Sequence, residues 1–355
     1  MAILQPQFKK IKVGLASFGM SGKVFHAPLL QAHIHFELYA ICERSKNEAI
    51  TIYPNVHIVK SFDELLLMAE VELIIVNTPD PTHFDHCKAA LLAGKHVVVE
   101  KPFVFTVKEG EELISIADNN NLVLSIFQNR RWDGDFLTVQ KIIAENKLGR
   151  IVEFRSNFER YRNYSVPGSW KESTNRFVGT VYNLGSHLAD QAMLLFGMPD
   201  GVFARIYNQR DFAEVDDFFQ LILIYKHVHV TLSAGYLMRE PTHRFVVNGT
   251  LGSFVKNGID PQEEMLKSGI LPTNRDFGKD SPANFGILHT EINGEAVRNE
   301  LETIQGNYLL YYDNIADCIR MGGILEVSAK ENLQLIRILE AAFQSQLENR
   351  IVFFT

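Results

Sequence analysis

The hydrophobic pattern of the first third of the chain alternates short apolar runs with helical segments. Runs at Ile11–Leu15, Phe36–Cys42 and Leu73–Val76 predict strands, and the last is apolar throughout, as expected for a strand buried on both faces. His96–Val99 and Leu122–Phe127 continue the series. Because helices separate the strands, we expect parallel pairing with right-handed crossovers. The predicted fold class is α/β, a doubly wound parallel sheet of the dinucleotide-binding type.

Capping patterns mark the helices of this part. Ser61 with Glu64, and Thr106 with Glu109, have the spacing at which each side chain satisfies a free N–H of the first helical turn. Gly94 supplies the left-handed residue that ends another helix. The helices predicted most clearly are Lys23–Ala32, Pro81–Ala93 and a segment that follows Thr106 and reaches Asn119.

The pattern changes after about Arg130. Longer strand candidates follow one another with short turns, as at Tyr225–His227, which predicts antiparallel pairing. A helix near Thr180–Phe196 interrupts them. The expected strands are Ile151–Tyr161, Val202–Tyr207, Phe218–Tyr225, Val228–Ala234 and Phe245–Val247.

The last part of the chain combines an irregular segment with two helices. Asn257–Asn299 is rich in Gly, Pro, Asn and Asp and is expected to be a long irregular excursion. The helices are predicted near Tyr308–Arg320 and Ser328–Leu347. We therefore expect two domains: a Rossmann domain over residues 1–129, and a C-terminal α+β domain over residues 130–355 with a large, mostly antiparallel open sheet. Because an open sheet leaves a face and edges to cover, a homodimer or homotetramer through this sheet is expected.

Composition narrows the function classes. The 355 residues carry a net charge of -7, which argues against a nucleic-acid backbone as main partner. No apolar run reaches the roughly 18–20 residues of a membrane span, and the N-terminal residues do not follow a signal-peptide pattern. Three widely spaced cysteines predict neither a disulfide scaffold nor a zinc ribbon, and His227 with His229 lacks a third ligand. We expect a cytoplasmic protein without a metal site.

A glycine-rich turn follows the first strand. In Gly14–Gly22 the usual G-x-G-x-x-G spacing falls on Ser17, Gly19 and Gly22, so serine replaces the glycine of the tight turn. Gly19 stands where backbone must approach a phosphate, and Gly22 where helix packs on strand. The turn predicts a dinucleotide site at a helix N-terminus; a glycine-rich turn without a ligand is the alternative. The residues expected to contact the cofactor here are Phe18, Gly19, Met20 and Ser21.

The end of the second strand bears on the choice between NAD and NADP. Glu43 can accept both ribose hydroxyls of NAD, whereas Arg44 can bind the 2′-phosphate of NADP. Glu43 would repel that phosphate unless it turns away, so the two residues together slightly favour NAD. A solvated surface pair is the alternative.

Two further motifs carry candidate chemistry. Glu100-Lys101-Pro102 follows a strand at the edge where open α/β sheets bind ligands, so Lys101 is placed to work on a substrate hydroxyl; a solvated lysine is the alternative. Asn183, His187 and Asp190 stand at i, i+4 and i+7 and would share one face of an α-helix. They form either a catalytic face or a solvated stripe with a satisfied histidine.

Taken together, these motifs resemble the Gfo/Idh/MocA oxidoreductases over nearly the full length of the chain. Any one match is modest, but the ordered set is specific. The matching signals are Gly19 and Gly22, Thr78-Pro79 with His83, Glu100-Lys101-Pro102, Gly185-Ser-His187 with Asp190, and Val327–Glu331. Asn129–Phe136 and Phe158–Arg162 are similar to a narrower branch that includes NADP-dependent scyllo-inositol dehydrogenases, and this branch, like Arg44, favours NADP.

The resemblance implies hydride transfer between NAD(P) and a sugar or inositol-like cyclic polyol. Lys101 would hydrogen-bond the reacting hydroxyl and His187 would exchange its proton, whereas Asn183 stands where the family usually has aspartate. The implied cofactor contacts add Thr78, Pro79, His83, Glu100, Lys101 and Asn129 to those of the glycine turn and to Glu43 and Arg44. The implied substrate contacts are Lys101, Arg160, Tyr161, Asn183, His187 and Asp190.

Two other functions remain open on the sequence alone. A cofactor-binding regulator can share this fold, and loss of the aspartate at Asn183 mildly favours one, although Lys101 and His187 argue against it. A glycosidase that uses bound NAD transiently also occurs in the family.

Overall fold

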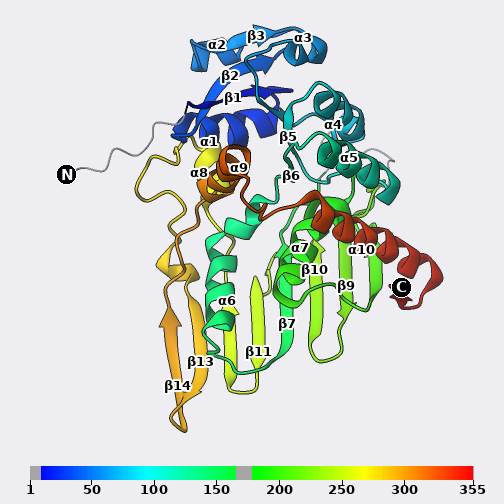
Figure 1. The fold of residues 1–355 in the computed structure, drawn as a ribbon. Helices are drawn as coiled ribbons and strands as arrows, with labels where there is room; N and C mark the ends of the chain where they lie inside the picture. Colours follow the sequence, from blue (N-terminus) through cyan, green and yellow to red (C-terminus); the bar gives the residue numbers. More distant parts are fainter. Residues whose placement is uncertain (1–8, 165–177, 355) are drawn as a thin grey trace. The chain divides into compact units, whose positions relative to one another are not determined.

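The computed structural model of the protein describes residues 9–164 and 178–354 and divides the chain into two units (Figure 1). Unit 1 comprises Met1–Asn129, Gln262–Phe277 and Asn307–Leu333. Unit 2 comprises Arg130–Pro261, Gly278–Gly306 and Gln334–Thr355. Each unit is built around its own sheet.

Unit 1 contains a six-stranded parallel sheet in the order β3-β2-β1-β4-β5-β6. This order confirms the predicted Rossmann fold, in which ligands bind beyond the carboxyl ends of the strands where the order reverses between β1 and β4. The central strands are apolar throughout because both of their faces are covered. The strands are β1 Ile11–Leu15, β2 Phe36–Cys42, β3 His57–Val59, β4 Leu73–Val76, β5 His96–Val99 and β6 Leu124–Ile126.

The helices of unit 1 begin at the predicted caps. The Ser61 hydroxyl accepts the Glu64 N–H, and Thr106 with Glu109 forms both bonds of a capping box. The helix expected at Lys23–Ala32 is divided into a π-helical turn and a short α-helix. The bounds are η1 Gly22–His26, α1 Ala27–Ala32, α2 Ala49–Ile52, α3 Phe62–Leu66, η2 Asp80–Thr82, α4 His83–Leu92 and α5 Val107–Asn119. The 3₁₀ turn η3 (Asn129–Trp132) spans the boundary to unit 2.

Two later segments of the chain also belong to unit 1. The predicted domain boundary differs, because it assigned all residues after 129 to the second domain. These segments carry α8 (Gln262–Lys267) and α9 (Leu309–Met321). On α9, the hydroxyl of the buried Tyr311 lies 3.0 Å from Ser125 Oγ on β6. Local sequence patterns do not predict this packing, because α9 contacts a strand that lies almost two hundred residues earlier in the chain.

Unit 2 contains a nine-stranded sheet in the order β14-β13-β12-β11-β7-β10-β9-β8-β15. Its neighbours are antiparallel except β7 and β10, which pair in parallel, so the predicted mostly antiparallel sheet is confirmed. The strands are β7 Ile151–Glu159, β8 Gly201–Tyr207, β9 Phe218–Ile224, β10 His229–Gly235, β11 Phe245–Gly249, β12 Gly252–Lys256, β13 Gly286–Ile292, β14 Glu295–Leu301 and β15 Val352–Phe353.

Helices cover one face of this sheet (Figure 1). Alternate strand residues such as Phe219, Leu221 and Leu223 of β9 form a core with apolar residues of the helices. The intervening residues of the strands lie outside this core. The helices are α6 Gly134–Ala144, the π-helical η5 Val181–Gly185, α7 Ser186–Phe196 and α10 Ala329–Glu348, which begins in unit 1.

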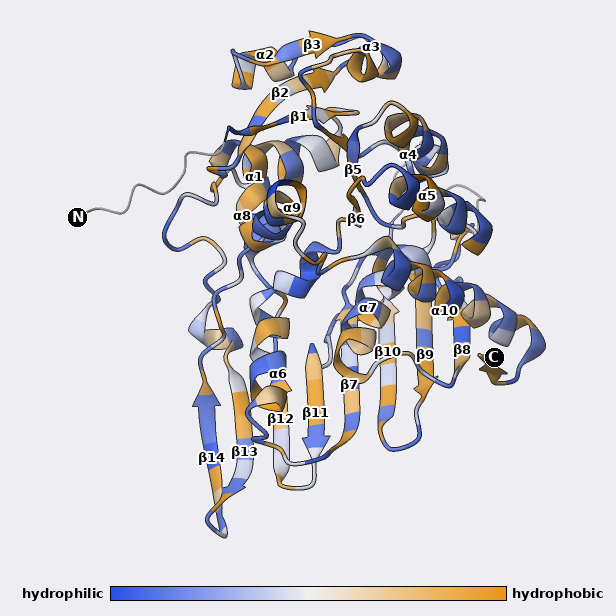
Figure 2. Cartoon of the chain, viewed as in Figure 1, coloured by the Kyte–Doolittle hydropathy of each residue, from blue (hydrophilic) through white to orange (hydrophobic). Residues whose placement is uncertain are grey.

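The prediction of an irregular excursion over Asn257–Asn299 is wrong in part. It contains α8, the short 3₁₀ turn η6 (Pro282–Asn284), β13 and the first half of β14. Strand β14 is largely exposed and coloured mostly hydrophilic in Figure 2, so it lacks the alternation by which half-buried strands are found. A charged edge strand of this kind discourages pairing with another chain. Because its residues are mostly polar, the hydrophobic pattern of the sequence did not predict this strand.

Within residues 9–164 and 178–354, none of the helices has the length and apolar character needed to cross a membrane.

Candidate active site

The serine that replaces the first glycine of the phosphate turn is tied to the end of β4. The Ser17 N–H donates to Asn77 Oδ1 at 2.9 Å, and the Ser17 hydroxyl donates to the Asn77 carbonyl oxygen at 2.8 Å. Asn77 Nδ2 in turn donates to the Ser17 carbonyl oxygen at 2.9 Å. Three hydrogen bonds therefore join the segments that follow β1 and β4, at the point where a Rossmann sheet binds its ligand. The serine that replaces glycine thus stabilises the turn.

The two remaining glycines have different surroundings. A Cβ added to Gly22 would lie 2.6 Å from the Ser17 carbonyl oxygen and 2.8 Å from Asn77 Nδ2, so this position must be glycine for the helix to pack. A Cβ on Gly19 would meet nothing closer than Ser17 Oγ at 3.9 Å. The backbone at Gly19 is open to a ligand, and the turn fits the approach of a pyrophosphate.

The other predicted residues of this turn divide between core and surface. Phe18 is buried edge-to-face on Tyr53, whereas Met20 is exposed. The Ser21 hydroxyl donates to Glu100, which follows β5. The structure thus brings together two predicted cofactor residues from opposite sides of the β1–β4 junction.

Glu100 lies at the centre of a buried polar chain in unit 1. His26 Nε2 lies 3.1 Å from its Oε1, and the other nitrogen of the same ring, Nδ1, lies 2.6 Å from the Tyr312 hydroxyl of α9. Burial alone would raise the pKa of Glu100, but the contacts with His26 and Ser21 and the nearby Lys101 ammonium lower it to about 2. Glu100 is therefore a carboxylate over the whole working pH range, and it also accepts the Lys101 backbone N–H at 3.2 Å.

His26 and Tyr312 are members of this chain that sequence reasoning missed. Both side chains are fully buried. The available signal was a histidine within an apolar helical stretch, because such a group needs a hydrogen-bond partner when it is buried. The partners themselves come from β5 and α9, which no local pattern reveals.

A second histidine fixes the two segments expected to face the nicotinamide. His83 is buried, with Nδ1 2.8 Å from the Pro102 carbonyl oxygen and Nε2 3.0 Å from that of Thr78. Thr78 also receives a hydrogen bond from the Thr82 hydroxyl, at 2.7 Å. His83 therefore links the end of β4 to the turn after β5, while Pro79 precedes the 3₁₀ turn η2. Whether these groups contact the cofactor stays a prediction, as it does for Asn129, which is buried at the start of η3.

The carboxylate of Glu43 is engaged with backbone. It is buried and accepts the N–H groups of Glu48, at 3.2 Å, and Ala49, at 2.9 Å, the second at the start of α2. Arg44 is exposed, and the described residues form no ion pair with it. The structure therefore shows Glu43 turned toward its own loop and the Arg44 side chain exposed to solvent.

The helix that carries Asn183 and His187 begins as a π-helix and becomes α-helical at Ser186. Because hydrogen bonds in a π-helix run from i to i+5, the predicted one-turn spacing between Asn183 and His187 crosses a change of helix type. His187 is buried and Asn183 half-buried. π-helical turns are frequent at functional sites, and this one coincides with the predicted catalytic segment.

Asp216 holds the start of that helix. Its Oδ2 accepts the Val181 N–H at 2.7 Å and the Thr180 hydroxyl at 2.8 Å. Burial raises the pKa of this carboxyl, against the hydrogen bonds that lower it. A Cβ on Gly185 would touch the Phe219 ring at 3.3 Å, so the helix also lies close on β9.

Asp190, a predicted substrate contact, forms a buried bidentate ion pair with Arg131, and its contact with substrate stays a prediction. Arg131 Nε and Nη2 lie 2.8 and 2.7 Å from the two carboxylate oxygens of Asp190. The next residue, Gln191, donates from Nε2 to the Arg130 carbonyl oxygen at 2.9 Å. The segment Asn129–Phe136, read from the sequence as a branch signature, is thus the support against which α7 is fixed.

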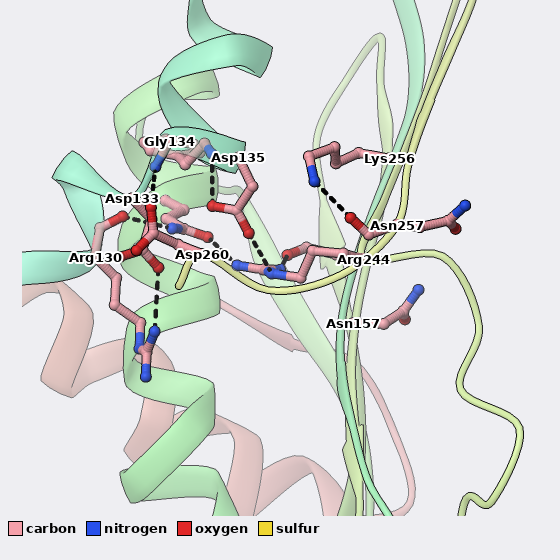
Figure 3. Close-up of polar contacts among 12 residues, drawn as sticks. Arg130, Asp133, Gly134, Asp135, Asn157, Arg244, Lys256, Asn257 and Asp260 are labelled. Atoms are coloured by element: carbon pink, nitrogen blue, oxygen red, sulfur yellow. Dashed lines mark hydrogen bonds and ion pairs between the residues drawn. The ribbon is translucent and has the colours of Figure 1, made fainter. Parts of the chain in front are cut away.

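Figure 3 shows the rest of this polar frame, which surrounds Arg244. Arg244 Nη1 donates to Ser156 Oγ at 2.6 Å, Nη2 donates to Gln191 Oε1 at 3.0 Å, and Nε lies 3.2 Å from Asp135. Burial lowers the pKa of Arg244 and the facing carboxylates oppose that shift. The guanidinium therefore joins β7, α6 and α7, so that a single buried cation orders three elements.

The predicted substrate residues Arg160 and Tyr161 lie just beyond the end of β7. The Arg160 guanidinium is 4.8 Å from the centre of the Tyr236 ring, and its Nη2 donates to the Tyr236 hydroxyl at 3.3 Å. Both Arg160 and Tyr161 are exposed. Lys101 belongs to unit 1 and His187 to unit 2, and their joint action on one substrate stays a prediction.

In the part of the chain that the structure describes, no three His, Cys, Asp or Glu side chains are grouped so that they could hold a metal ion.

Comparison with known proteins identifies the class. Residues 11–128 match a family model described as the NAD-binding Rossmann fold of an oxidoreductase family, and residues 140–353 match the C-terminal alpha/beta domain of the same family. The chain belongs to the Gfo/Idh/MocA oxidoreductases. It is an enzyme of the NAD(P)-dependent dehydrogenase and reductase class that acts on CH–OH groups, as the sequence resemblance implied.

Particular relatives cover almost the whole chain. One is the scyllo-inositol 2-dehydrogenase (NADP(+)) IolW of Bacillus subtilis, 39% identical over 96% of this chain and 95% of the relative. Among solved structures, an oxidoreductase of Bacteroides fragilis is 50% identical with a TM-score of 0.91, covering 98% of this chain and all of that one. YvaA of Bacillus subtilis is 38% identical with a TM-score of 0.93, covering 98% and 99%.

The two glycines of the phosphate turn yield a paired prediction. Gly22→Ala should lower the stability of unit 1 by about 1–3 kcal/mol, because the new Cβ overlaps backbone. Gly19→Ala should leave the unfolding midpoint within about 0.5 kcal/mol of the parent but weaken NAD(P)H binding at least about tenfold, because the methyl group occupies the space of the phosphate. Thermal unfolding and fluorescence titration with NADPH and NADH would measure both. Unchanged binding in Gly19→Ala would contradict the assignment of this turn.

Proposed function

We propose that the protein is an NADP-dependent dehydrogenase or reductase of a sugar or inositol-like cyclic polyol. The main support is the relative named scyllo-inositol 2-dehydrogenase (NADP(+)), which matches this chain over 96% of its length. A second relative, 26% identical over 53% of the chain, is named D-glucoside 3-dehydrogenase, which supports the same substrate class. The candidate residues Lys101 and His187 supply an ammonium and an imidazole for such chemistry.

The proposed mechanism divides the work between cofactor and side chains. When bound, the nicotinamide accepts or supplies the hydride of the substrate carbon. Lys101 donates a hydrogen bond to the reacting hydroxyl and stabilises the negative charge that develops on its oxygen. His187 accepts the hydroxyl proton during oxidation and returns it during reduction, because imidazole titrates near the working pH. Asn183 orients a substrate hydroxyl without adding charge.

The hydrogen bonding of Glu43 supports NADP over NAD as the cofactor. The sequence favoured NAD slightly, on the condition that Glu43 faces the ribose. Its two oxygens accept backbone N–H groups of its own loop, so its charge is directed away from the solvent face where Arg44 is exposed. An exposed guanidinium beside a carboxylate that is hydrogen-bonded to its own loop suits a 2′-phosphate.

A panel of neutral polyols, aldoses and glycosides with each cofactor tests the proposed function, followed by absorbance of the reduced nicotinamide. Lys101→Ala should lower kcat by about 10²–10³ while the NADPH dissociation constant stays within about twofold, because the lost donor acts on the substrate oxygen. Lys108→Ala, an exposed lysine at the start of α5, is the matched control and should retain activity. Full turnover in Lys101→Ala would refute the assigned role.

The same panel separates the rival functions. Tight NADPH binding without turnover of any substrate would favour a regulatory protein. Cleavage of an aryl glycoside without net nicotinamide reduction would favour the glycosidase reaction.

Cofactor choice gives a separate prediction. Arg44→Ala should lower kcat/KM for NADP by about tenfold to hundredfold, since a hydrogen bond to a charged group contributes about 1.5–3 kcal/mol. The value for NAD should change by less than about threefold, because NAD lacks the phosphate that Arg44 would bind. Equal losses for both cofactors would show that Arg44 acts on the fold and not on the phosphate.

We further propose that the protein works in the cytoplasm as a homodimer or homotetramer through the sheet of unit 2. The support is the alternation of strands such as β9, whose second face lies outside the core of the unit. Light scattering on the purified protein would give the number of subunits, and a monomer would refute the assembly.

A further inference from the structure

Unit 2 contains a cluster of arginines around Tyr236 that the proposed mechanism does not use. The guanidinium groups of Arg160 and Arg210 lie 4.8 and 5.1 Å from the centre of the Tyr236 ring. A third, that of Arg162, lies 5.7 Å from it. We call these three residues the arginine cluster.

The cluster is held by backbone that extends the sheet. Gly235 ends β10 and pairs with Glu159 at the end of β7 and with Phe218 at the start of β9. Beyond this row the Arg162 N–H donates to the Tyr236 carbonyl oxygen at 2.7 Å, and Tyr161 forms a bridge with Leu237. Tyr236 and its guanidinium neighbours therefore lie on ordered backbone at one end of the central strands β7, β10 and β9.

The cluster holds more positive charge than its carboxylates neutralise. Asp217 is buried and is engaged by Arg210, whose Nε lies 2.8 Å from its Oδ2. Glu159 accepts two hydrogen bonds from Thr242. Within the described part of the chain, Arg160 forms no ion pair and is exposed. There its guanidinium has only the neutral Tyr236 hydroxyl as a hydrogen-bond acceptor.

The cluster lies at the end of these strands that also holds the start of the predicted catalytic helix. Asp217, which pairs with Arg210, follows Asp216, whose carboxylate accepts the Val181 N–H at the first turn of η5. Asn183 lies in that π-helical segment. The adjacent side chains of Asp216 and Asp217 thus connect the arginine cluster to the segment expected to bind substrate hydroxyls.

We propose that the arginine cluster binds an oxyanion carried by the substrate, and that the preferred substrate is a polyol or sugar that bears a carboxylate or a phosphate. The inference rests on the proposed function and adds the substrate class to it. A guanidinium fork matches the geometry of both anions, and stacking on tyrosine fixes the orientation of the fork before the ligand arrives. Arg160 supplies charge that the fold leaves without a carboxylate partner, and the Tyr236 hydroxyl orients its guanidinium.

Matched substrates test this inference on the full chain with NADP or NADPH. Glucose, glucuronate and glucose 6-phosphate differ in the absence, presence and type of anion, so the two charged compounds distinguish carboxylate from phosphate. We expect kcat/KM for at least one charged compound to exceed that for glucose at least about tenfold, and rising salt to raise its KM. Arg160→Gln should lower the ratio of charged to neutral kcat/KM at least about tenfold.

Arg155→Gln is the matched control. Arg155 is an exposed arginine on β7, the strand that Arg160 follows; it is paired with Glu153 and stands outside the cluster, so both activities and their ratio should be unchanged. Isothermal titration of the NADP-bound protein with each charged compound gives a readout independent of turnover. Binding that Arg160→Gln weakens supports the inference even if no compound is turned over, in which case only the proposed function fails. Turnover with equal preference for neutral and charged compounds, or a ratio that Arg160→Gln leaves unchanged, overturns the inference while the proposed function stands.

Discussion

A buried polar or charged side chain must find a partner, and in this protein those partnerships fix the segments expected to carry the chemistry. In unit 1 the carboxylate of Glu100 joins the phosphate turn, the first helix and α9 through Ser21, His26 and, by way of His26, Tyr312. In unit 2 Asp190 and its neighbour Gln191 hold α7 against Arg130 and Arg131. Leaving any of these groups buried and unpaired would cost several kcal/mol, roughly, so the pairing strongly favours one arrangement of each segment.

The same requirement for hydrogen-bond partners determines the contacts of several acidic residues. Glu43 and Asp190 are predicted ligand contacts, and Asp216 is a carboxylate that the sequence did not single out. All three carboxylates accept hydrogen bonds from protein groups. These carboxylates are engaged inside the units, whereas the side chains of Arg44 and Arg160 are exposed. At these two positions the exposed charge is positive, although the net charge of the chain is -7.

The two departures from the family pattern differ in kind. Ser17 replaces a glycine, and its hydroxyl and backbone bind Asn77, so the turn is held by side-chain hydrogen bonds in addition to its tight geometry. Asn183 replaces an aspartate in a π-helical segment whose start is bound by a different carboxylate, Asp216. The first departure keeps the turn in place through hydrogen bonds of Ser17 and not through the geometry of a glycine. The second removes a charge from a segment that already lies beside two acidic residues, Asp216 and Asp217.

The sequence by itself determined the parallel sheet, the capped helices of unit 1, the mostly antiparallel second sheet and the motifs that mark the site, because these depend on local periodicity and on residue types at fixed spacing. It did not reveal the β13–β14 hairpin, whose exposed edge carries too little apolar pattern, or the packing of α9 in unit 1. Only the tertiary structure decided which groups Glu43, Asp190 and His26 contact and that arginines gather around Tyr236. Those contacts join residues far apart in the chain, and a carboxylate that caps a helix has the same sequence signature as one that binds a ligand.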